Sequence, residues 1–98
     1  MVEVRWTLQA AQDLESIVEF ISKNSLHYAR LFAIDVFRTI DRIAAFPASG
    51  RIVPEIGDHQ IRETITGSYR LVYRLKENRI EMLTIFHGAR LFDPDWVT

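Results

Sequence analysis

The sequence predicts an α+β fold of order β-α-α-β-β-β, in which a helical hairpin packs on one face of a mostly antiparallel four-stranded sheet. Three observations carry this prediction: strict alternation in residues 69–75, apolar residues at helical spacing in residues 8–46, and a segment rich in glycine and proline between them. A chain of 98 residues can bury one core, so we expect a single domain over residues 1–98.

The first predicted element is a short strand at residues 2–6. The run Val-Glu-Val-Arg-Trp alternates apolar and charged side chains, as a half-buried strand does. No second strand follows it closely enough to make a hairpin. We therefore expect it to join the sheet formed by the later strands.

Two amphipathic helices follow, at about residues 8–23 and 26–46. Thr7 and Ser25 are suitable N-cap residues, and Pro47 ends the second helix because the residue before a proline avoids helical geometry. Apolar residues recur at helical spacing in both. The first stripe is Leu8, Ala11, Leu14, Val18 and Ile21; the second is Ala29, Phe32, Ala33, Val36, Phe37, Ile40, Ile43 and Ala44.

Residues 47–60 show no period and predict a loop, whereas residues 61–87 predict three strands in two hairpins. Gly67 or Asn78 can supply the positive φ of a tight turn. In the middle strand, residues 69–75, the alternation of side chains between the two faces is clear. Tyr69, Leu71, Tyr73 and Leu75 share the face expected under the helices, while Arg70, Val72 and Arg74 share the opposite face, which we expect to be open.

The composition fits a globular protein and excludes several classes. The net charge of −1 gives no general attraction for nucleic acid, so any such role needs a local cluster of the arginines in the second half. No window is apolar enough to span a membrane, and the first residues lack the pattern of a secretory signal. Cysteine is absent and the histidines have no ligand spacing, so we expect a cytoplasmic protein without metal or cofactor.

Taken together, the motifs resemble the RelE/ParE superfamily of toxins from type II toxin-antitoxin systems, also known from plasmid stabilisation. The similarity covers nearly the whole chain. Its motifs are Asp13-Leu14 within the helix 11–21, Pro47-x-x-Gly50-Arg51-x-Val53-Pro54-Glu55, Ile61-Arg62-Glu63, Tyr69-Arg70-Leu71-Val72-Tyr73-Arg74 and Phe86-His87-Gly88-Ala89-Arg90. The resemblance implies a toxin that is neutralised by a cognate, ParD-like antitoxin.

The superfamily has two activities, and the resemblance favours the ParE-like one, in which the toxin poisons DNA gyrase without a hydrolytic site. RelE-like toxins instead cut mRNA on the ribosome. Arg70 and Arg90 match arginines of that nuclease site, but Ile61 and Glu63 stand where it has lysines. The terminal catalytic tyrosine is also missing, Trp96 being the nearest aromatic residue.

Ribosome-dependent mRNA cleavage stays as the alternative, because it needs a general base and arginine does not give up its proton near neutral pH. Glu55 or His87 would have to fill that role, as a glutamate and a histidine do in some RNA-cleaving relatives. The candidate catalytic residues are therefore Arg70, His87, Arg90 and Glu55. Glu55, His87 and Arg70 could converge as base, acid and phosphate clamp if the loop 47–60 folds back over the strands.

A third reading is a non-toxic interaction module whose sheet face or edge accepts a partner. In either reading an acidic antitoxin segment would bind the guanidinium groups by charge-assisted hydrogen bonds. The predicted antitoxin- or target-binding residues are Arg51, Arg62, Arg70, Arg74 and Arg90. Gyrase, or the ribosome with its mRNA, would be the target, and a homodimer is a further partner to test.

Overall fold

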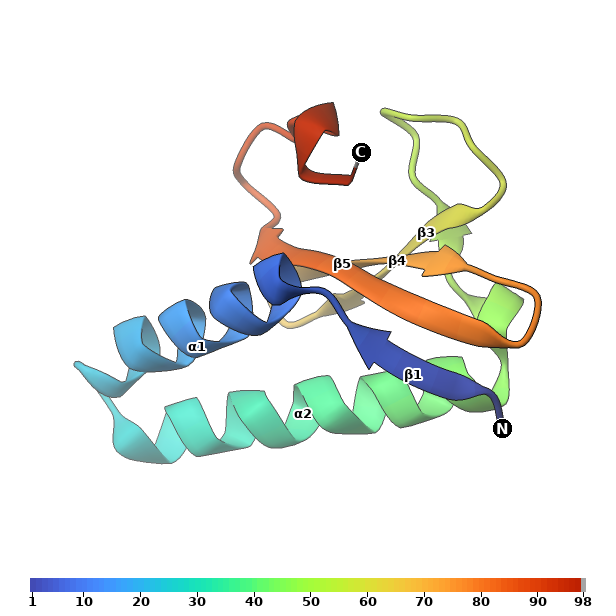
Figure 1. The fold of residues 1–98 in the computed structure, drawn as a ribbon. Helices are drawn as coiled ribbons and strands as arrows, with labels where there is room; N and C mark the ends of the chain where they lie inside the picture. The colour runs from blue at the N-terminus through green and yellow to red at the C-terminus, as the bar shows by residue number, and fades with distance from the viewer. Residues whose placement is uncertain (98) are drawn as a thin grey trace.

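The computed structural model describes residues 1–97, which form two helices on one face of a five-stranded sheet (Figure 1). The predicted α+β class and element order are confirmed. The helices are α1 (Leu8–Ser22) and α2 (Leu26–Ala45), with short 3-10 helices η1 (Pro47–Ser49) and η2 (Pro94–Val97). The strands are β1 (Glu3–Trp6), β2 (Arg51–Ile52), β3 (Ile61–Thr66), β4 (Tyr69–Leu75) and β5 (Arg79–His87). Neither of the described helices has the length and apolarity needed to cross a membrane.

The strand order is β1-β5-β4-β3-β2, with β1 parallel to β5 and every other pair antiparallel. β1 therefore joins the sheet, as predicted. The prediction of four strands was one short, because β2 lies inside the segment 47–60 that was read as a loop. Two residues are too few to show a period of two.

Both predicted helix caps are confirmed, and the helix bounds agree within one residue. The Thr7 hydroxyl accepts a hydrogen bond from the Ala10 N–H at 3.1 Å, and the Ser25 hydroxyl accepts one from the Tyr28 N–H at 3.1 Å. Thr7 also donates to the Met82 carbonyl at 2.8 Å. The same hydroxyl thus begins α1 and fastens that helix to β5.

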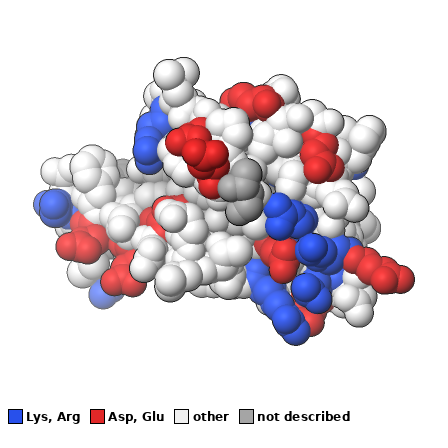
Figure 2. Space-filling model, turned by 45° about the horizontal axis from the view of Figure 1, so that its top comes forward, with Lys and Arg blue, Asp and Glu red and all other residues white. Residues whose placement is uncertain are grey.

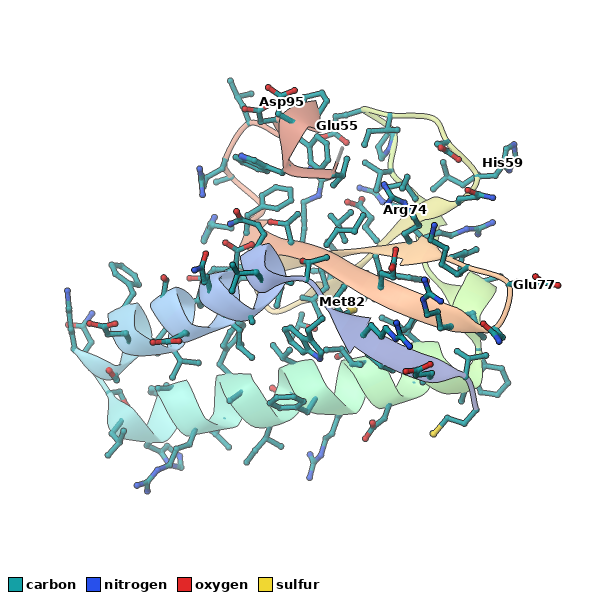
Figure 3. The ribbon with its side chains drawn as sticks, viewed as in Figure 1. Glu55, His59, Arg74, Glu77, Met82 and Asp95 are labelled. Carbon is teal, nitrogen blue, oxygen red and sulfur yellow. The ribbon has the colours of Figure 1, made fainter. Side chains whose placement is uncertain are left out.

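The core between sheet and helices has the predicted register on β4. Leu71 and Tyr73 are fully buried against α2, in a cluster that includes Ile40 and Ile43. Figure 3 shows Met82 on this helix side of the sheet and Arg74 on the other. The predicted helical stripes were too wide, since Leu8 and Phe37 remain 74% and 51% exposed.

The opposite face of the sheet was predicted to be open, and this was wrong. Two segments cover it, which we call the loop cover (residues 53–58) and the tail cover (residues 92–97), and both rise above the sheet in Figure 1. They pack over a second buried cluster. Its buried members are Val53, Ile61, Val72, Leu83, Phe86 and Val97, with Ile56, Phe92 and Trp96 partly buried beside them.

α1 is tied to β5 at a bulge in the sheet. The register between β4 and β5 shifts between Val72 and Tyr73, which leaves an extra residue on β5. Beyond the end of β1, the Asp13 Oδ2 atom accepts hydrogen bonds from the Thr84 hydroxyl at 2.6 Å and the Ile85 N–H at 3.0 Å. Asp13 therefore satisfies an edge amide that no strand reaches.

Two glycines have clear structural reasons. Gly67 makes the β3–β4 turn at φ +58°, whereas the alternative, Asn78, does not have a positive φ. A Cβ at Gly50 would lie 2.4 Å from the Tyr73 hydroxyl. That hydroxyl accepts from the Gly50 N–H at 2.9 Å and donates to the Pro47 carbonyl at 2.8 Å, so it fastens the segment after α2 to the sheet.

We expect Tyr73→Phe to lower the free energy of unfolding by about 1–3 kcal/mol, because it leaves a buried N–H and a carbonyl without their partner. Urea denaturation measures this change. Tyr28→Phe is the matched control, since Tyr28 is 66% exposed, and it should change stability by less than about 0.5 kcal/mol. Equal effects of the two substitutions would contradict the role given to the Tyr73 hydroxyl.

Candidate functional site

Arg70 lies at the centre of the sheet face under the two covers. Arg70 is only 8% exposed. The guanidinium carbon lies 5.0 Å from the centroid of the Phe86 ring and 5.4 Å from that of Phe92. Phe86 comes from β5 and Phe92 from the tail cover, so Arg70 is held by cation–π contacts with both the sheet and its cover.

Two carboxylates occupy the donors of Arg70. Its Nε donates to the Glu63 Oε1 at 2.6 Å, and its two terminal nitrogens donate to the Glu55 carboxylate at 2.8 and 2.9 Å. The other oxygen of Glu63 accepts from Arg51. Two arginines and two glutamates therefore form a neutral group, which we call the Arg70 network: Arg51, Glu55, Glu63 and Arg70.

Local structure explains how these four residues meet. Glu63 on β3 faces Val72 on β4, so it lies diagonally across from Arg70 on the same face of the sheet. Glu55 comes from a tight turn in the loop cover, where the Val53 carbonyl accepts from the N–H groups of Ile56 and Gly57. Gly57 adopts φ +72°, which only glycine takes readily.

The ion pair between Glu55 and Arg70 favours the charged forms of both residues. The hydrogen bond from Arg70 is the main cause that lowers the pKa of Glu55 from 4.5 to about 2, and partial burial opposes this shift. The hydrogen bond to Glu55 raises the pKa of Arg70. Glu55 is therefore a carboxylate at neutral pH whose two oxygens both accept from Arg70. A carboxylate with so low a pKa binds a proton too weakly to be an efficient general base near neutral pH.

His87 does not join Arg70 and Glu55. Along β5 successive side chains alternate, so Phe86 lies on the side of Arg70 and His87 on the side of the helices. The His87 ring packs on the edge of Tyr69 with centroids 5.2 Å apart, and its Nδ1 accepts from the Ala89 N–H at 3.0 Å. The predicted candidates Glu55 and Arg70 thus come together, but His87 faces away from them.

Arg90 lies at the end of the sheet beside the tail cover. Its guanidinium carbon is 4.7 Å from the centroid of the Trp96 ring, and its residue is exposed. Arg90 and Trp96 border a cavity of about 100 Å³. Gln9 and Asp13 of α1 line the same cavity, and they are joined by a 2.7 Å hydrogen bond.

Arg62 and Arg74 also hold chain segments in place. Arg62 donates to the carbonyls of Ala48, Gly50 and His59, at 3.2, 3.1 and 3.1 Å. Arg74 donates to the Val97 carbonyl at 2.8 Å. On the face that Figure 2 shows, acidic residues lie among the cations at one end of the molecule.

Sequence reasoning missed three contributors to this site. Glu63 was noted only as a departure from a lysine, although its side chain is fully buried. Phe92 and Trp96 pack on Phe86 with ring centroids 5.5 and 4.9 Å apart. The aromatic content of the last residues was the available signal, since exposed tails seldom carry a phenylalanine and a tryptophan. Among the described residues no group of three or more His, Asp or Glu is placed to hold a metal ion.

The depressed pKa of Glu55 predicts a pH dependence. An acid whose pKa is lower in the folded than in the unfolded protein stabilises the fold fully above its unfolded pKa. This stabilisation is lost as the pH falls through the folded pKa. The wild type should therefore be more stable than Glu55→Gln by a constant margin above about pH 5. That margin should shrink between pH 4.5 and 2. Denaturation series of both proteins from pH 2 to 7 measure it, with Glu77→Gln as a control in the β4–β5 turn; a margin independent of pH contradicts the pairing.

Comparisons with known proteins agree with this structure. Residues 4–92 match the family model described as the ParE toxin of the type II toxin-antitoxin system parDE. The protein named "Putative toxin Y4kP" of Sinorhizobium fredii is 30% identical over 87 residues, which cover 87% of this chain and 86% of that protein. Both matches carry the name of a toxin.

Two solved structures share the fold. The first, from the chromosomal ParDE system of P. aeruginosa, has a TM-score of 0.70 at 20% identity and covers 89% of this chain and 96% of that one. The second, from the RelBE2 toxin-antitoxin complex of Mycobacterium tuberculosis, has a TM-score of 0.60 at 21% identity, covering 91% and 93%. The resemblance to the RelE/ParE superfamily is thus confirmed, and the chain belongs to the ParE toxin family of type II toxin-antitoxin systems.

Proposed function

We propose that this toxin acts by poisoning DNA gyrase, that it does not cut RNA, and that a cognate antitoxin neutralises it. The observation that carries the proposal is the closed Arg70 network. Cleavage of RNA through the ribose 2′-hydroxyl needs a base, an acid and cations around the phosphate. Here the best cation, Arg70, is buried between Phe86 and Phe92 and its donors are taken by Glu55 and Glu63.

The remaining candidate catalytic residues, His87 and Arg90, do not replace Arg70. His87 is exposed but lies on the helix side of β5, beside Tyr69. Arg90 is exposed, but its guanidinium stacks on the Trp96 ring. Binding to a protein target does not need a proton-transfer site. The match to the ParE family supports gyrase as that target. Gyrase acts in the cytoplasm, where we place the toxin.

Purified toxin should inhibit gyrase-catalysed supercoiling and increase the amount of cleaved DNA, while mRNA on translating ribosomes stays intact. Supercoiling gels and toeprinting measure the two activities. His87→Ala removes the one histidine among the candidates from an exposed position, so it should leave gyrase inhibition unchanged. Cleavage of mRNA in the ribosomal A site that disappears in His87→Ala would overturn the proposal.

The antitoxin is proposed to bind through an acidic, amphipathic segment. Two solved relatives come from toxin-antitoxin systems, which supports a partner of this kind. Arg70 is inaccessible, so among the arginines predicted to bind, the most exposed are Arg51, with a side chain 65% exposed, and Arg90. Charge-assisted hydrogen bonds to these guanidinium groups would give affinity that falls with salt.

Arg90→Glu should weaken antitoxin binding about tenfold or more, since a hydrogen bond to a charged group contributes roughly 1.5–3 kcal/mol. Isothermal titration with the acidic half of the antitoxin measures this loss. Arg38→Glu makes the same charge change at an exposed position of α2, and it should alter affinity by less than about twofold. Equal losses of affinity in both variants would show that the net charge of the toxin, rather than Arg90 itself, determines the affinity. Unchanged affinity in Arg90→Glu would show that Arg90 lies outside the interface.

A further inference from the structure

The outer side of α2 carries a line of four exposed residues, Arg30, Ile34, Phe37 and Asp41. Their spacing of four, three and four residues is that of the a and d positions in a coiled coil, so their side chains lie along one side of the helix. Figure 1 shows α2 at the base of the molecule, with no described segment below it. We call this line of four residues the α2 seam.

The centre of the α2 seam is apolar. Ile34 is 46% exposed and Phe37 is 51% exposed, although Phe37 also packs on Trp6 of β1. Leu31, beside Ile34 on the next turn of the helix, is 42% exposed. Exposed apolar side chains at helical spacing are typical of a surface that binds another protein segment.

The two ends of the α2 seam carry opposite charges that are not used within the chain. Among residues 1–97, the structure gives neither the Arg30 nor the Asp41 side chain an ion pair or a hydrogen bond. They cannot pair with each other, because the helix between them is about 16 Å long. In chain order the seam is therefore positive, apolar, apolar and negative.

We propose that the α2 seam binds the same seam of a second copy of the chain, with the two helices antiparallel about a two-fold axis between Asp35 and Val36. In this register Ile34 of each copy packs against Phe37 of the other. Arg30 of each copy lies beside Asp41 of the other. Two apolar layers are thus flanked by two ion pairs, at the distance of about 8–10 Å between helix axes that such packing allows.

Charge complementarity selects a second copy as the occupant. A two-fold axis reverses the direction of the seam, so the positive end of one copy meets the negative end of the other. A parallel arrangement would place Arg30 beside Arg30 and Asp41 beside Asp41, and like charges weaken association. An acidic antitoxin segment would be attracted by Arg30 but repelled by Asp41, so the α2 seam fits its own copy better than an acidic partner.

Charge reversal tests the register of the dimer. In sedimentation equilibrium of the toxin alone, the mass should rise with concentration from 11.4 kDa to twice that value. Arg30→Asp places two aspartates in each charged layer, and Asp41→Arg places two arginines there, so each variant should stay monomeric. An equimolar mixture of the two variants restores both ion pairs and should dimerise. Circular dichroism of each variant checks that it is folded.

The matched controls for this experiment are Arg42→Asp and Asp35→Arg. They make the same changes of net charge at exposed positions of α2 outside the seam, so both should dimerise like the wild type. A wild type that is monomeric at all concentrations would overturn the proposal. Dimers of both seam variants on their own, or a mixture of them that stays monomeric, would also overturn it.

Ile34→Glu tests the apolar centre of the seam. It places a charge in both apolar layers and should abolish the dimer. Ile65→Glu is the matched control, because Ile65 is 54% exposed but lies on β3 rather than on α2, and it should dimerise like the wild type. Unchanged dimerisation of Ile34→Glu would overturn the proposal. A monomeric wild type whose antitoxin binding is lost in Ile34→Glu would assign the seam to the antitoxin instead.

Discussion

The fold depends on a buried ion pair between adjacent strands, Arg70 on β4 and Glu63 on β3. Glu63 has no exposed side-chain surface, and Arg70 is almost as deep. Removing one partner of such a pair leaves an uncompensated charge and costs about 3–5 kcal/mol. The pair therefore needs the rest of the network: Glu55 brings the loop cover, and Phe92 brings the tail cover, over the charges. Each cover shields Arg70 from water and is itself held in place by its contact with Arg70.

The same logic extends to the other arginines of the second half. Arg62 binds carbonyls around η1 and the segment before β3, Arg74 binds the carbonyl of Val97, and Arg90 stacks on Trp96. Guanidinium groups suit this task because they carry five donors in a planar fork and stay charged. The segments over the sheet are short and irregular, so backbone hydrogen bonds alone do not hold them. Arginine side chains hold these segments in place instead. Much of the donor capacity of these arginines is therefore used within the chain.

Sequence patterns predicted the parts of this structure that repeat. The alternation of Tyr69 to Leu75 fixed which side of β4 faces the helices, and the hydroxyls of Thr7 and Ser25 marked both helix starts. The covers have no period, so nothing in their pattern showed that they fold back on the sheet. The partners of Arg70 could not be predicted because Glu55 is brought to it by the path of a loop. Alternation gives the face of a strand, but what lies over that face is decided by tertiary structure.

The position of β1 in the sheet has a consequence for the order of events during synthesis. β1 leaves the ribosome before the other described strands, yet its partner within the chain is β5, and Glu3 lies beside Arg79. Asp13 of α1 likewise waits for Thr84 and Ile85. Contacts between such distant segments form slowly because a long loop must close first. The sheet of the nascent toxin therefore stays incomplete until β5 has left the ribosome, and β1 remains unpaired until then.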